Sequence, residues 1–457
     1  MEQTTAKKNK YEIDMCNGTI MDKLISFSLP LMLSGILQLM FNAVDIIVVG
    51  RFSGSQALAA VGSTSALINV FTNLFIGISL GANVLTARFY AAGREKEVSE
   101  TVHTAITLAL VSGIVMALVG LVFSRGALAL MGTPDDVIGL SALYMRIYFL
   151  GMPFFMLYNY GAAILRAVGD TKRPLLFLVI AGVINACLNM VLVIVFKLGV
   201  AGVAIATVIS QMISCVLVLR CLCRSESSYR LRFSELGMKG YYLKQIFSVG
   251  VPAGIQSTVI NFSNVLLQSS VNSFGSTAMA GYTAANNLLG FLYVSVNSIT
   301  QACMSFTSQN YGVGKLKRMD RVLADCMILS VVVAVVLGCI CYGFGPEILQ
   351  IYTEDAEVIA CGMEILAYTT ITYFLCGWMD LFPGALRGMG YSAVPMVLSV
   401  IGTVGTRVVW IFGIFPYHRS LAILFISYPA SWIITIIMQV ICYLIVRKKV
   451  HSRAAAV

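Results

Sequence analysis

The sequence predicts an all-α membrane protein with about twelve transmembrane helices in two six-helix lobes, related by a parallel internal duplication. Three observations support this fold class. The 457 residues are 58% hydrophobic and only 11% charged, whereas soluble domains carry about 25% charged residues. Apolar runs long enough to span a membrane follow one another along the chain. A ten-residue segment also recurs in the second half.

That segment is LRAVGDTKRP at 165–174, which returns as LRGMGYSAVP at 386–395, 221 residues later. The same spacing relates three further pairs: Gly54 and Gly275, Tyr90 and Tyr311, Gly93 and Gly314. Six spans in each copy would begin and end on one side of the membrane, so the copies have parallel topology. Duplication of a membrane-embedded chain is typical of secondary transporters.

Each predicted span is an apolar segment long enough to cross a hydrocarbon core of about 30 Å. In chain order the spans are 24–50, 57–87, 98–124, 137–164, 174–196, 201–223, 245–270, 277–307, 322–345, 358–386, 392–415 and 420–446. They give an N-terminal six-helix lobe at 1–223 and a C-terminal six-helix lobe at 245–457. The basic linker at 224–244 is expected to be a cytoplasmic tether.

Basic residues orient these spans, because Lys and Arg near span ends stay on the cytoplasmic side. With the N-terminus inside, the outer loops hold only Arg51, Arg125, Lys197 and Arg419 of the 31 Lys and Arg. We therefore expect a multi-pass protein of the inner (plasma) membrane with both termini in the cytoplasm. The net charge of +10 then faces membrane lipids, and no nucleic-acid partner is expected.

The motifs of several enzyme classes are missing from the sequence. It contains neither a GxxxxGK[ST] phosphate loop nor an HExxH zinc motif, and its 12 cysteines form no CxxC pair. We therefore expect no enzyme activity and no cofactor, with Na⁺ or H⁺ as the coupling ion of a transporter. Nothing in the sequence requires more than a monomer.

Polar residues within spans are costly, so their spacing indicates where function is located. In the first span, Gln38, Asn42 and Asp45 share a helical face. Similar stripes in the seventh and eighth spans contain Asn261, Asn264, Gln268, Tyr293 and Asn297. A single Asn of this kind more often joins helices by a hydrogen bond of about 1 kcal/mol. Matching stripes in both lobes favour a polar cleft for substrate.

Asp45 is the strongest candidate for ion coupling. It lies about 12 Å beyond the middle of the first span, and Asn185, Asn189 and Thr207 of the fifth and sixth spans fall at a comparable depth. Oxygen ligands suit a hard cation such as Na⁺, with Asp45 as a possible metal ligand, and a desolvated carboxylate suits proton uptake. The alternative is a structural carboxylate that caps a neighbouring helix.

Three other charged residues lie inside spans. Asp380 either attracts a cationic substrate or pairs with Arg387 at the end of the same span. Arg146 and Arg407 lie deep enough to need partners, and we expect them to brace the interiors of their lobes.

The chain resembles the multidrug and toxic compound extrusion (MATE) family over essentially its whole length. The resemblance rests on PLMLSGILQLMFNAVDIIVVGRFSGSQALAAVG, on AGVAIATVISQ, on the two repeated loops and on the duplication. It implies a V-shaped cleft between two lobes and the exchange of inward Na⁺ or H⁺ for outward cationic, amphipathic compounds. By position, it assigns Asp45, Asn185 and Thr207 to the family's acid in helix 1, Asn in helix 5 and Thr in helix 6.

The sequence departs from the family pattern in both lobes. Asn189 stands where many members of the DinF-type branch have a second Asp, which leaves Asp45 as the lone anion of its cluster. The segment GIQSTVINFSNVLLQ lacks the helix 7 acid of the NorM-type pattern, and Asp380 lies about one turn beyond the position of its helix 10 acid.

These features predict a multidrug efflux transporter that works by alternating-access antiport on cationic small molecules. A lipid-linked saccharide or metabolite exporter of the same superfamily is one alternative. A saccharide flippase would need a cluster of intramembrane cations, whereas only Arg146 and Arg407 lie inside spans. An uncoupled channel is the other alternative, and the sequence leaves it open.

Overall fold

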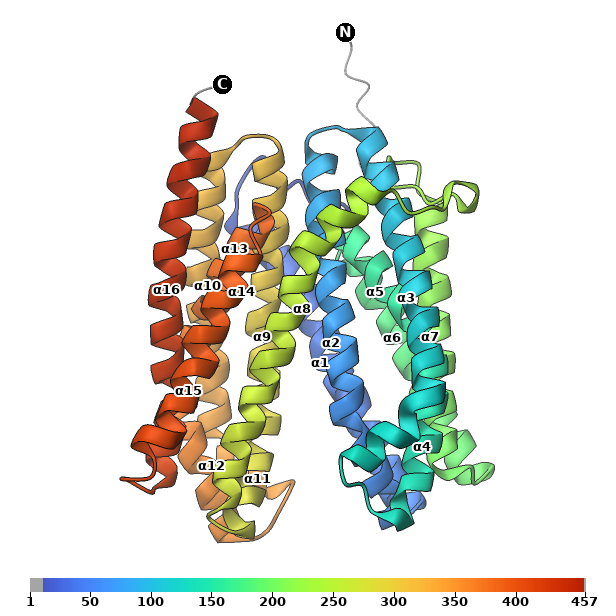
Figure 1. Ribbon diagram of the computed structural model, residues 1–457, viewed down its shortest axis with the longest axis vertical. Helices are drawn as coiled ribbons and strands as arrows, with labels where there is room; N and C mark the ends of the chain where they lie inside the picture. Colours follow the sequence, from blue (N-terminus) through green and yellow to red (C-terminus); the bar gives the residue numbers. More distant parts are fainter. Residues whose placement is uncertain (1–10, 456–457) are drawn as a thin grey trace. The chain divides into compact units, whose positions relative to one another are not determined.

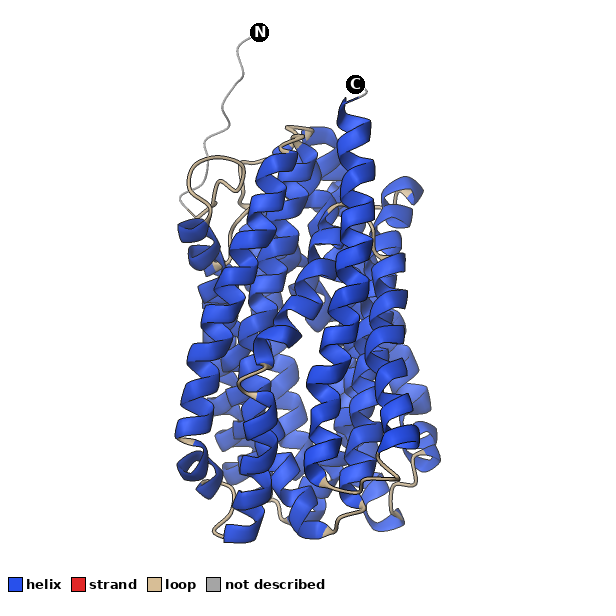
Figure 2. Cartoon of the chain, turned by 90° about the vertical axis from the view of Figure 1, so that its left-hand side faces the viewer, coloured by secondary structure: helices blue, strands red, loops and turns tan. Residues whose placement is uncertain are grey.

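The computed structural model describes residues 11–455, which are helical apart from short loops and contain no strand (Figure 2). The helices form two compact units. The first unit is Leu33–Val251 with the residues up to Ile13, and the second is Asp14–Met32 with Pro252–Val457.

The first unit is built around α5, which packs against α2, α3 and α7 (Figure 1). A core of buried apolar side chains, including Phe149 and Tyr160, fills the space between these helices. Its helices are α1 (Met21–Phe52, from Leu33), α2 (Ser55–Ala91), α3 (Glu95–Leu130), α4 (Asp135–Leu150), α5 (Met152–Ala167), α6 (Lys172–Asn189) with the π-helical segment η1 (Met190–Val195), and α7 (Gly199–Cys223).

The second unit is built around α9, which packs against α10, α12 and α13, while α13 also contacts α16. A separate apolar core, including Phe425 and Trp432, holds it together. Its helices are α8 (Gly240–Asn272, from Pro252), α9 (Ser276–Gly312), α10 (Leu316–Gly343), α11 (Gly345–Gln350), α12 (Ala356–Thr369), α13 (Tyr373–Gly388), α14 (Ala393–Ser399), η3 (Val400–Gly405), α15 (Thr406–Val409), η4 (Trp410–Ile414) and α16 (Leu421–Ala455).

The predicted fold class is confirmed. In the described residues, eight helices are long and apolar enough to cross a membrane, and the bent pairs α4–α5 (47°) and α12–α13 (51°) are two more candidate spans. The remaining two predicted spans correspond to α8 and α9, which have 33 and 37 residues. Every predicted span therefore coincides with a helix or a bent pair of helices.

The structure also keeps the register of the duplication. The helices α2 and α9 begin at Ser55 and Ser276 and end at Ala91 and Gly312, so both ends lie 221 residues apart. Equivalent loops turn through glycines with left-handed φ values, 95° at Gly169 and 92° at Gly390, a conformation that costs glycine little. Each residue of one unit can therefore be compared with its counterpart 221 positions away.

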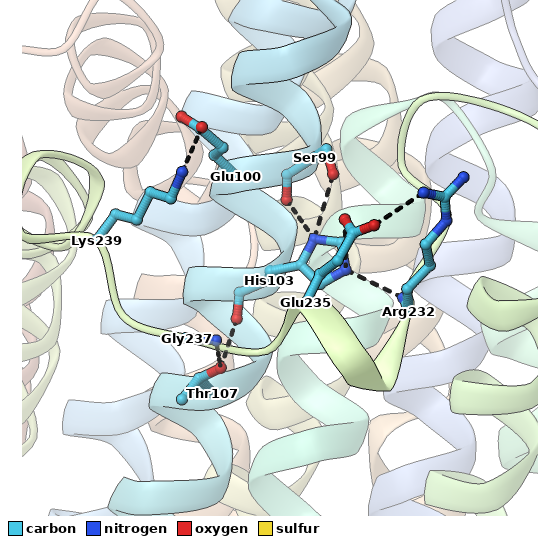
Figure 3. Close-up of polar contacts among 8 residues, drawn as sticks. All are labelled: Ser99, Glu100, His103, Thr107, Arg232, Glu235, Gly237 and Lys239. Carbon is cyan, nitrogen blue, oxygen red and sulfur yellow. Dashed lines mark hydrogen bonds and ion pairs between the residues drawn. The ribbon is translucent and has the colours of Figure 1, made fainter.

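The linker packs along α3 and is more than the predicted tether (Figure 3). His103 on α3 accepts a hydrogen bond from the Arg232 backbone N–H at 3.0 Å through Nε2, while its Nδ1 lies 2.7 Å from the Ser99 carbonyl oxygen. The Gly237 backbone N–H donates to Thr107 at 3.0 Å. One ion pair, Lys239 with Glu100, joins the linker to α3, and a second, Arg232 with Glu235, lies within the linker next to His103.

This docking changes the boundary of the first unit, which ends at Val251 rather than before residue 224. The start of α8 adds a close helix contact, since a Cβ on Gly250 would lie 2.5 Å from the Ile78 Cα of α2. The linker therefore belongs to the first unit because of its hydrogen bonds to α3, and the start of α8 because its backbone lies close to that of α2.

The segment before α1 changes the second unit. Asn310 donates a hydrogen bond to the Met15 carbonyl oxygen at 3.1 Å, and Lys315 donates to Asn17 at 2.7 Å. These contacts place Asp14–Met32 in the second unit, although the sequence boundaries put them in the N-terminal lobe.

Candidate functional site

The four predicted coupling residues are brought together in the first unit by α1, α6 and α7. The half-buried carboxylate of Asp45 accepts a short hydrogen bond from the Asn189 side-chain amide. The same amide donates to Asn185 Oδ1 at 3.2 Å. Both asparagines are buried on α6, one turn apart. The spacing that predicted a shared depth therefore also gives direct contact.

Thr207 completes the group from α7. Its hydroxyl lies beside the Asp45 carboxylate and donates its proton to the Val203 carbonyl oxygen at 3.0 Å. Because that proton is used within the helix, the Thr207 oxygen can still act as an acceptor or as a cation ligand.

One atom of this group lacks a partner. Asn189 Oδ1 is buried and makes no hydrogen bond, a condition that costs roughly 1–3 kcal/mol for a polar group. It adds to the oxygens of Asp45, Asn185 and Thr207, and a hard monovalent cation favours ligands of this kind. No cluster of three or more His, Cys, Asp or Glu occurs among the described residues, so one carboxylate and neutral oxygens would have to hold the ion.

The backbone conformation of α6 changes directly after the coupling residues. Directly after Asn189, α6 continues as the π-helical segment η1, in which the Phe196 backbone N–H bonds the Val191 carbonyl oxygen at 3.0 Å. Such segments are rare and are frequently found at functional sites. The wider turn also shifts the helical face after Asn189.

Two tyrosines of this site are not among the residues predicted from sequence. Tyr144 and Tyr148 on α4 stack with ring centroids 6.2 Å apart, and both interact electrostatically with Asp45. Gln211 of α7 lies beside the Tyr148 hydroxyl. The available signal was spacing: the two tyrosines are four residues apart, and Gln211 follows Thr207 by four.

The predicted substrate residues of the first unit lie apart from this hydrogen-bonded group. Gln38 and Asn42 are exposed on α1 and make no hydrogen bond with another described residue. Their amides are therefore available to a ligand.

The predicted substrate residues of the second unit behave differently from one another. Asn261 and Gln268 are exposed on α8, and Tyr293 on α9 is 45% exposed. Asn297 accepts a hydrogen bond from Gln301 at 3.1 Å and so has a structural contact. Asn264 accepts one from Arg407. The stripe thus contains both free and internally bonded side chains.

Asp380 on α13 is partly buried and makes no hydrogen bond or ion pair with a described residue. Arg387 instead donates to Gln256 Oε1 at 2.6 Å and interacts with Asp380 only over a longer range. The direct pairing with Arg387 that the sequence allowed is therefore not observed. Tyr293 also interacts electrostatically with Asp380, which brings two predicted substrate residues together.

The expected bracing role is wrong for Arg146. Its side chain is exposed and has no hydrogen-bonding partner in the described chain, because Met145 and Phe149 occupy the buried face of α4. Arg407 is 3% exposed and donates to Ser263 and Asn264 of α8. Those are the contacts expected of a brace.

Comparisons with known proteins agree with this architecture. The MatE family model matches residues 30–191 and 252–412. The probable multidrug resistance protein YoeA of Bacillus subtilis is 32% identical over 434 residues, which are 93% of each chain. The multidrug export protein MepA of Staphylococcus aureus is 22% identical over 83% of this chain and 84% of its own.

Solved structures show the same fold. An outward-facing multidrug resistance MATE transporter superposes with a TM-score of 0.88 at 19% identity, covering 99% of this chain and 100% of its own. A variant of the Vibrio cholerae MATE transporter VcmN gives 0.87 at 18% identity, covering 94% and 97%. The two segments matched by the family model repeat the internal duplication and make up more than half of the sequence; the chain belongs to the MatE family.

Proposed function

We propose that this chain is a secondary active multidrug efflux transporter that exchanges Na⁺ or H⁺ for cationic, amphipathic compounds by alternating access. The observation that carries this proposal is the contact of Asp45 with Asn189, next to a buried oxygen that has no partner. The relatives named as multidrug resistance and export proteins support the substrate class.

Coupling would act through the contact between α1 and α6. When ionised, Asp45 would hold the Asn189 amide by a charge-assisted hydrogen bond, which is roughly twice as strong as a neutral one. A proton or Na⁺ on Asp45 would weaken that hold. The ion would then favour whichever arrangement of α1 binds it better, and transport follows from that difference in affinity.

Close packing makes α1 sensitive to this change. The Phe41 ring, one turn before Asp45, lies directly against Gly182 of α6, where no side chain could be added without a clash. Because α1 and α6 fit tightly here, loss of the Asp45 contact would shift the helix.

Substrate binding would use the unbonded polar side chains. A cationic compound would be attracted by Asp380, whose carboxylate has no direct partner in the described chain, and would contact Tyr293 beside it. Exposed amides give contacts without a fixed pattern, which suits several substrates; they are Gln38, Asn42, Asn261 and Gln268. The protein would work as a monomer in the inner (plasma) membrane with both termini in the cytoplasm.

The test is transport of the cationic dye ethidium in proteoliposomes under an imposed Na⁺ gradient or an imposed pH gradient. Asp45→Asn should reduce gradient-driven transport at least about tenfold, the equivalent of 1.4 kcal/mol, while the protein still inserts. Asp136→Asn, which neutralises an exposed acid at the start of α4, is the matched control. Gradient-driven transport that survives in Asp45→Asn would refute the coupling role.

The same experiment separates the alternatives. Dye movement that follows only the dye's own gradient would indicate an uncoupled channel. No dye movement under either gradient would point to a lipid-linked saccharide or another metabolite as substrate.

A further inference from the structure

The second unit contains a buried cation that the proposed function does not use. Arg407 on α15 is 3% exposed. Its Nη1 donates to Ser263 Oγ at 2.8 Å and to Asn264 Oδ1 at 2.7 Å. Its guanidinium carbon lies 4.7 Å from the ring centroid of Tyr428 on α16. All of these partners are uncharged.

No acid compensates this charge. Within residues 11–455, no carboxylate lies within 4.0 Å of the Arg407 guanidinium. The groups that face it electrostatically are Tyr428, Cys376, Tyr282 and Tyr373, which carry no negative charge in their ordinary protonated forms. Asp380 interacts instead with Arg387. Arg407 therefore has no counter-charge in direct contact.

The unused donors of Arg407 share one edge. Both hydrogens of Nη1 are engaged, whereas Nε is buried without a partner and Nη2 bonds no described residue. The N–H groups of Nε and Nη2 point in the same direction, and this edge of a guanidinium matches the two oxygens of a carboxylate.

Two tyrosines add a further donor. The hydroxyls of Tyr282 and Tyr428 lie 3.0 Å apart and bond each other. One hydroxyl donates in that contact, so the proton of the other is not used by it.

The duplication places this cluster at the counterpart of the coupling site. Arg407 corresponds to Ala186, which lies between Asn185 and Asn189, and Tyr428 corresponds to Thr207. The π-helical segments η3 and η4 flank Arg407, as η1 follows Asn189. The corresponding region thus carries an acid, Asp45, in the first unit and a base, Arg407, in the second, at positions that are not equivalent in the repeat.

A brace does not need that charge. Hydrogen bonds to Ser263 and Asn264 do not require a charged donor, and burying a guanidinium without a counter-charge costs roughly several kcal/mol. A bound anion would offset this cost and occupy the idle edge.

We propose that Arg407 forms an anion-binding site in the second unit. The site binds one small anion at the Nε–Nη2 edge of the Arg407 guanidinium. The unused hydroxyl proton of Tyr282 or Tyr428 belongs to the same group of donors. The anion is either the carboxylate of an amphipathic solute or an inorganic halide. If the ligand is a carboxylate, the range of substrates would include anions as well as cations. If the ligand is a halide, it would be a structural counter-ion of Arg407.

The test measures melting of the purified full-length protein in nanodiscs, in buffer of low salt, with increasing salicylate or chloride. Salicylamide, which has the same ring but no charge, is the ligand control. We expect a saturable rise in melting temperature with salicylate or chloride and none with salicylamide. Salicylate alone would identify a carboxylate ligand, whereas chloride that stabilises equally and competes with salicylate would identify a halide.

Two variants locate the site. Arg407→Gln removes the charge, and Asn264→Asp keeps the side-chain shape while placing a carboxylate against Nη1. Both should weaken anion binding at least about tenfold. Should Arg407→Gln fail to fold, Asn264→Asp decides.

The proposal is wrong if neither anion stabilises the wild type, or if Asn264→Asp responds as the wild type does. Binding needs no ion gradient, so this result is independent of the proposed antiport. Asp45→Asn should accordingly retain the full response to the anion.

Discussion

The two units have the same backbone plan, but the buried charge in each unit has an uncharged counterpart in the other. In the first unit, Asp45 accepts a hydrogen bond from the Asn189 amide of α6, which also bonds Asn185; its counterpart in the second unit is Leu266. In the second unit, Arg407 is surrounded by Ser263, Asn264 and an aromatic ring; its counterpart in the first is Ala186. Duplication has therefore preserved helix register and loop turns while the buried electrostatics diverged.

This difference separates what the repeat requires from what function requires. Equivalent glycines with φ of 87° at Gly54 and 100° at Gly275 serve the fold in both units, because other residues rarely adopt that conformation. Buried charges are costly and differ between the copies, so they are better indicators of function than the repeated loops.

The largest expected effect comes from Asn189→Ala, which tests whether the first unit binds the coupling ion. The change removes the hydrogen bond to Asp45 and the unpaired oxygen. Loss of a bond to a charged group costs about 1.5–3 kcal/mol. If the coupling ion is H⁺, the less stabilised carboxylate should bind it more tightly, so the H⁺ concentration for half-maximal transport should fall about tenfold or more. If the ion is Na⁺, loss of the Asn189 oxygen as a ligand should raise the Na⁺ concentration for half-maximal transport. Proteoliposome transport at varied Na⁺ and pH measures both concentrations.

Asn159→Ala is the control for that variant, because the Asn159 amide bonds the Phe155 carbonyl of its own helix at 2.8 Å, away from the coupling residues. An ion dependence that is unchanged in Asn189→Ala, or equally changed in both variants, would contradict the assignment.

Asp380→Asn should have the next largest effect and asks whether the second unit shares in coupling. Because Asp380 has no direct partner among the described residues and lies near Tyr293, we expect a KM for ethidium about three- to tenfold higher. The dependence on the coupling ion should not change. Measuring both quantities in the same proteoliposomes separates the two roles. A loss of ion dependence like that of Asp45→Asn would assign coupling to both units.

Much of the fold could be predicted from sequence because it depends on length, apolarity and repeat spacing. The depth of Asp45, Asn185, Asn189 and Thr207 could also be predicted, since an α-helix rises by about 1.5 Å per residue. That fixed rise is why the sequence alone places these four residues at one depth.

The direction of side chains around each helix could not be predicted in the same way. Helices that are apolar on all sides give no pattern that marks the buried face. The sequence therefore predicts the same role for Arg146 and Arg407, whereas Arg146 is exposed and Arg407 is buried. The use of Asn264 by Arg407 also depends on how α8 and α15 pack. The bend of 47° between α4 and α5, and with it the place of Tyr144, is likewise set by packing.

A smaller effect is expected from Gly388→Ala, which compares the packing around one position of the second unit with that around its counterpart in the first unit. Its counterpart, Ala167, already carries a methyl group. At Gly388 an added Cβ would lie 2.7 Å from the Met304 carbonyl oxygen and 2.9 Å from the Thr307 Cβ. Overpacking of this kind costs about 1–3 kcal/mol, so the melting temperature in detergent should fall. Gly237→Ala, where nothing lies within 4 Å, is the control, and equal melting of the two variants would show that the contact can relax.

The smallest effect concerns the linker, which docks only on the first unit. The Arg232 side chain, by a hydrogen bond, holds the pKa of Glu235 below its ordinary value. This ion pair therefore helps docking above the ordinary pKa of a glutamate and is lost as the pH falls through the lowered value. Glu235→Gln should mimic the acid form at pH 7 and increase hydrogen–deuterium exchange in 232–239 only slightly, because Glu235 is exposed.

His103→Ala should increase the same exchange more than Glu235→Gln does, since it removes the buried acceptor of the Arg232 backbone N–H at 3.0 Å. Transport should change less than about twofold in both variants, because neither residue contacts the Asp45 cluster. A twofold change corresponds to well under 1 kcal/mol. A transport loss in His103→Ala as large as that of Asn189→Ala would mean that the linker takes part in coupling. The asymmetry between the units would then extend from their buried charges to the segment that joins them in sequence.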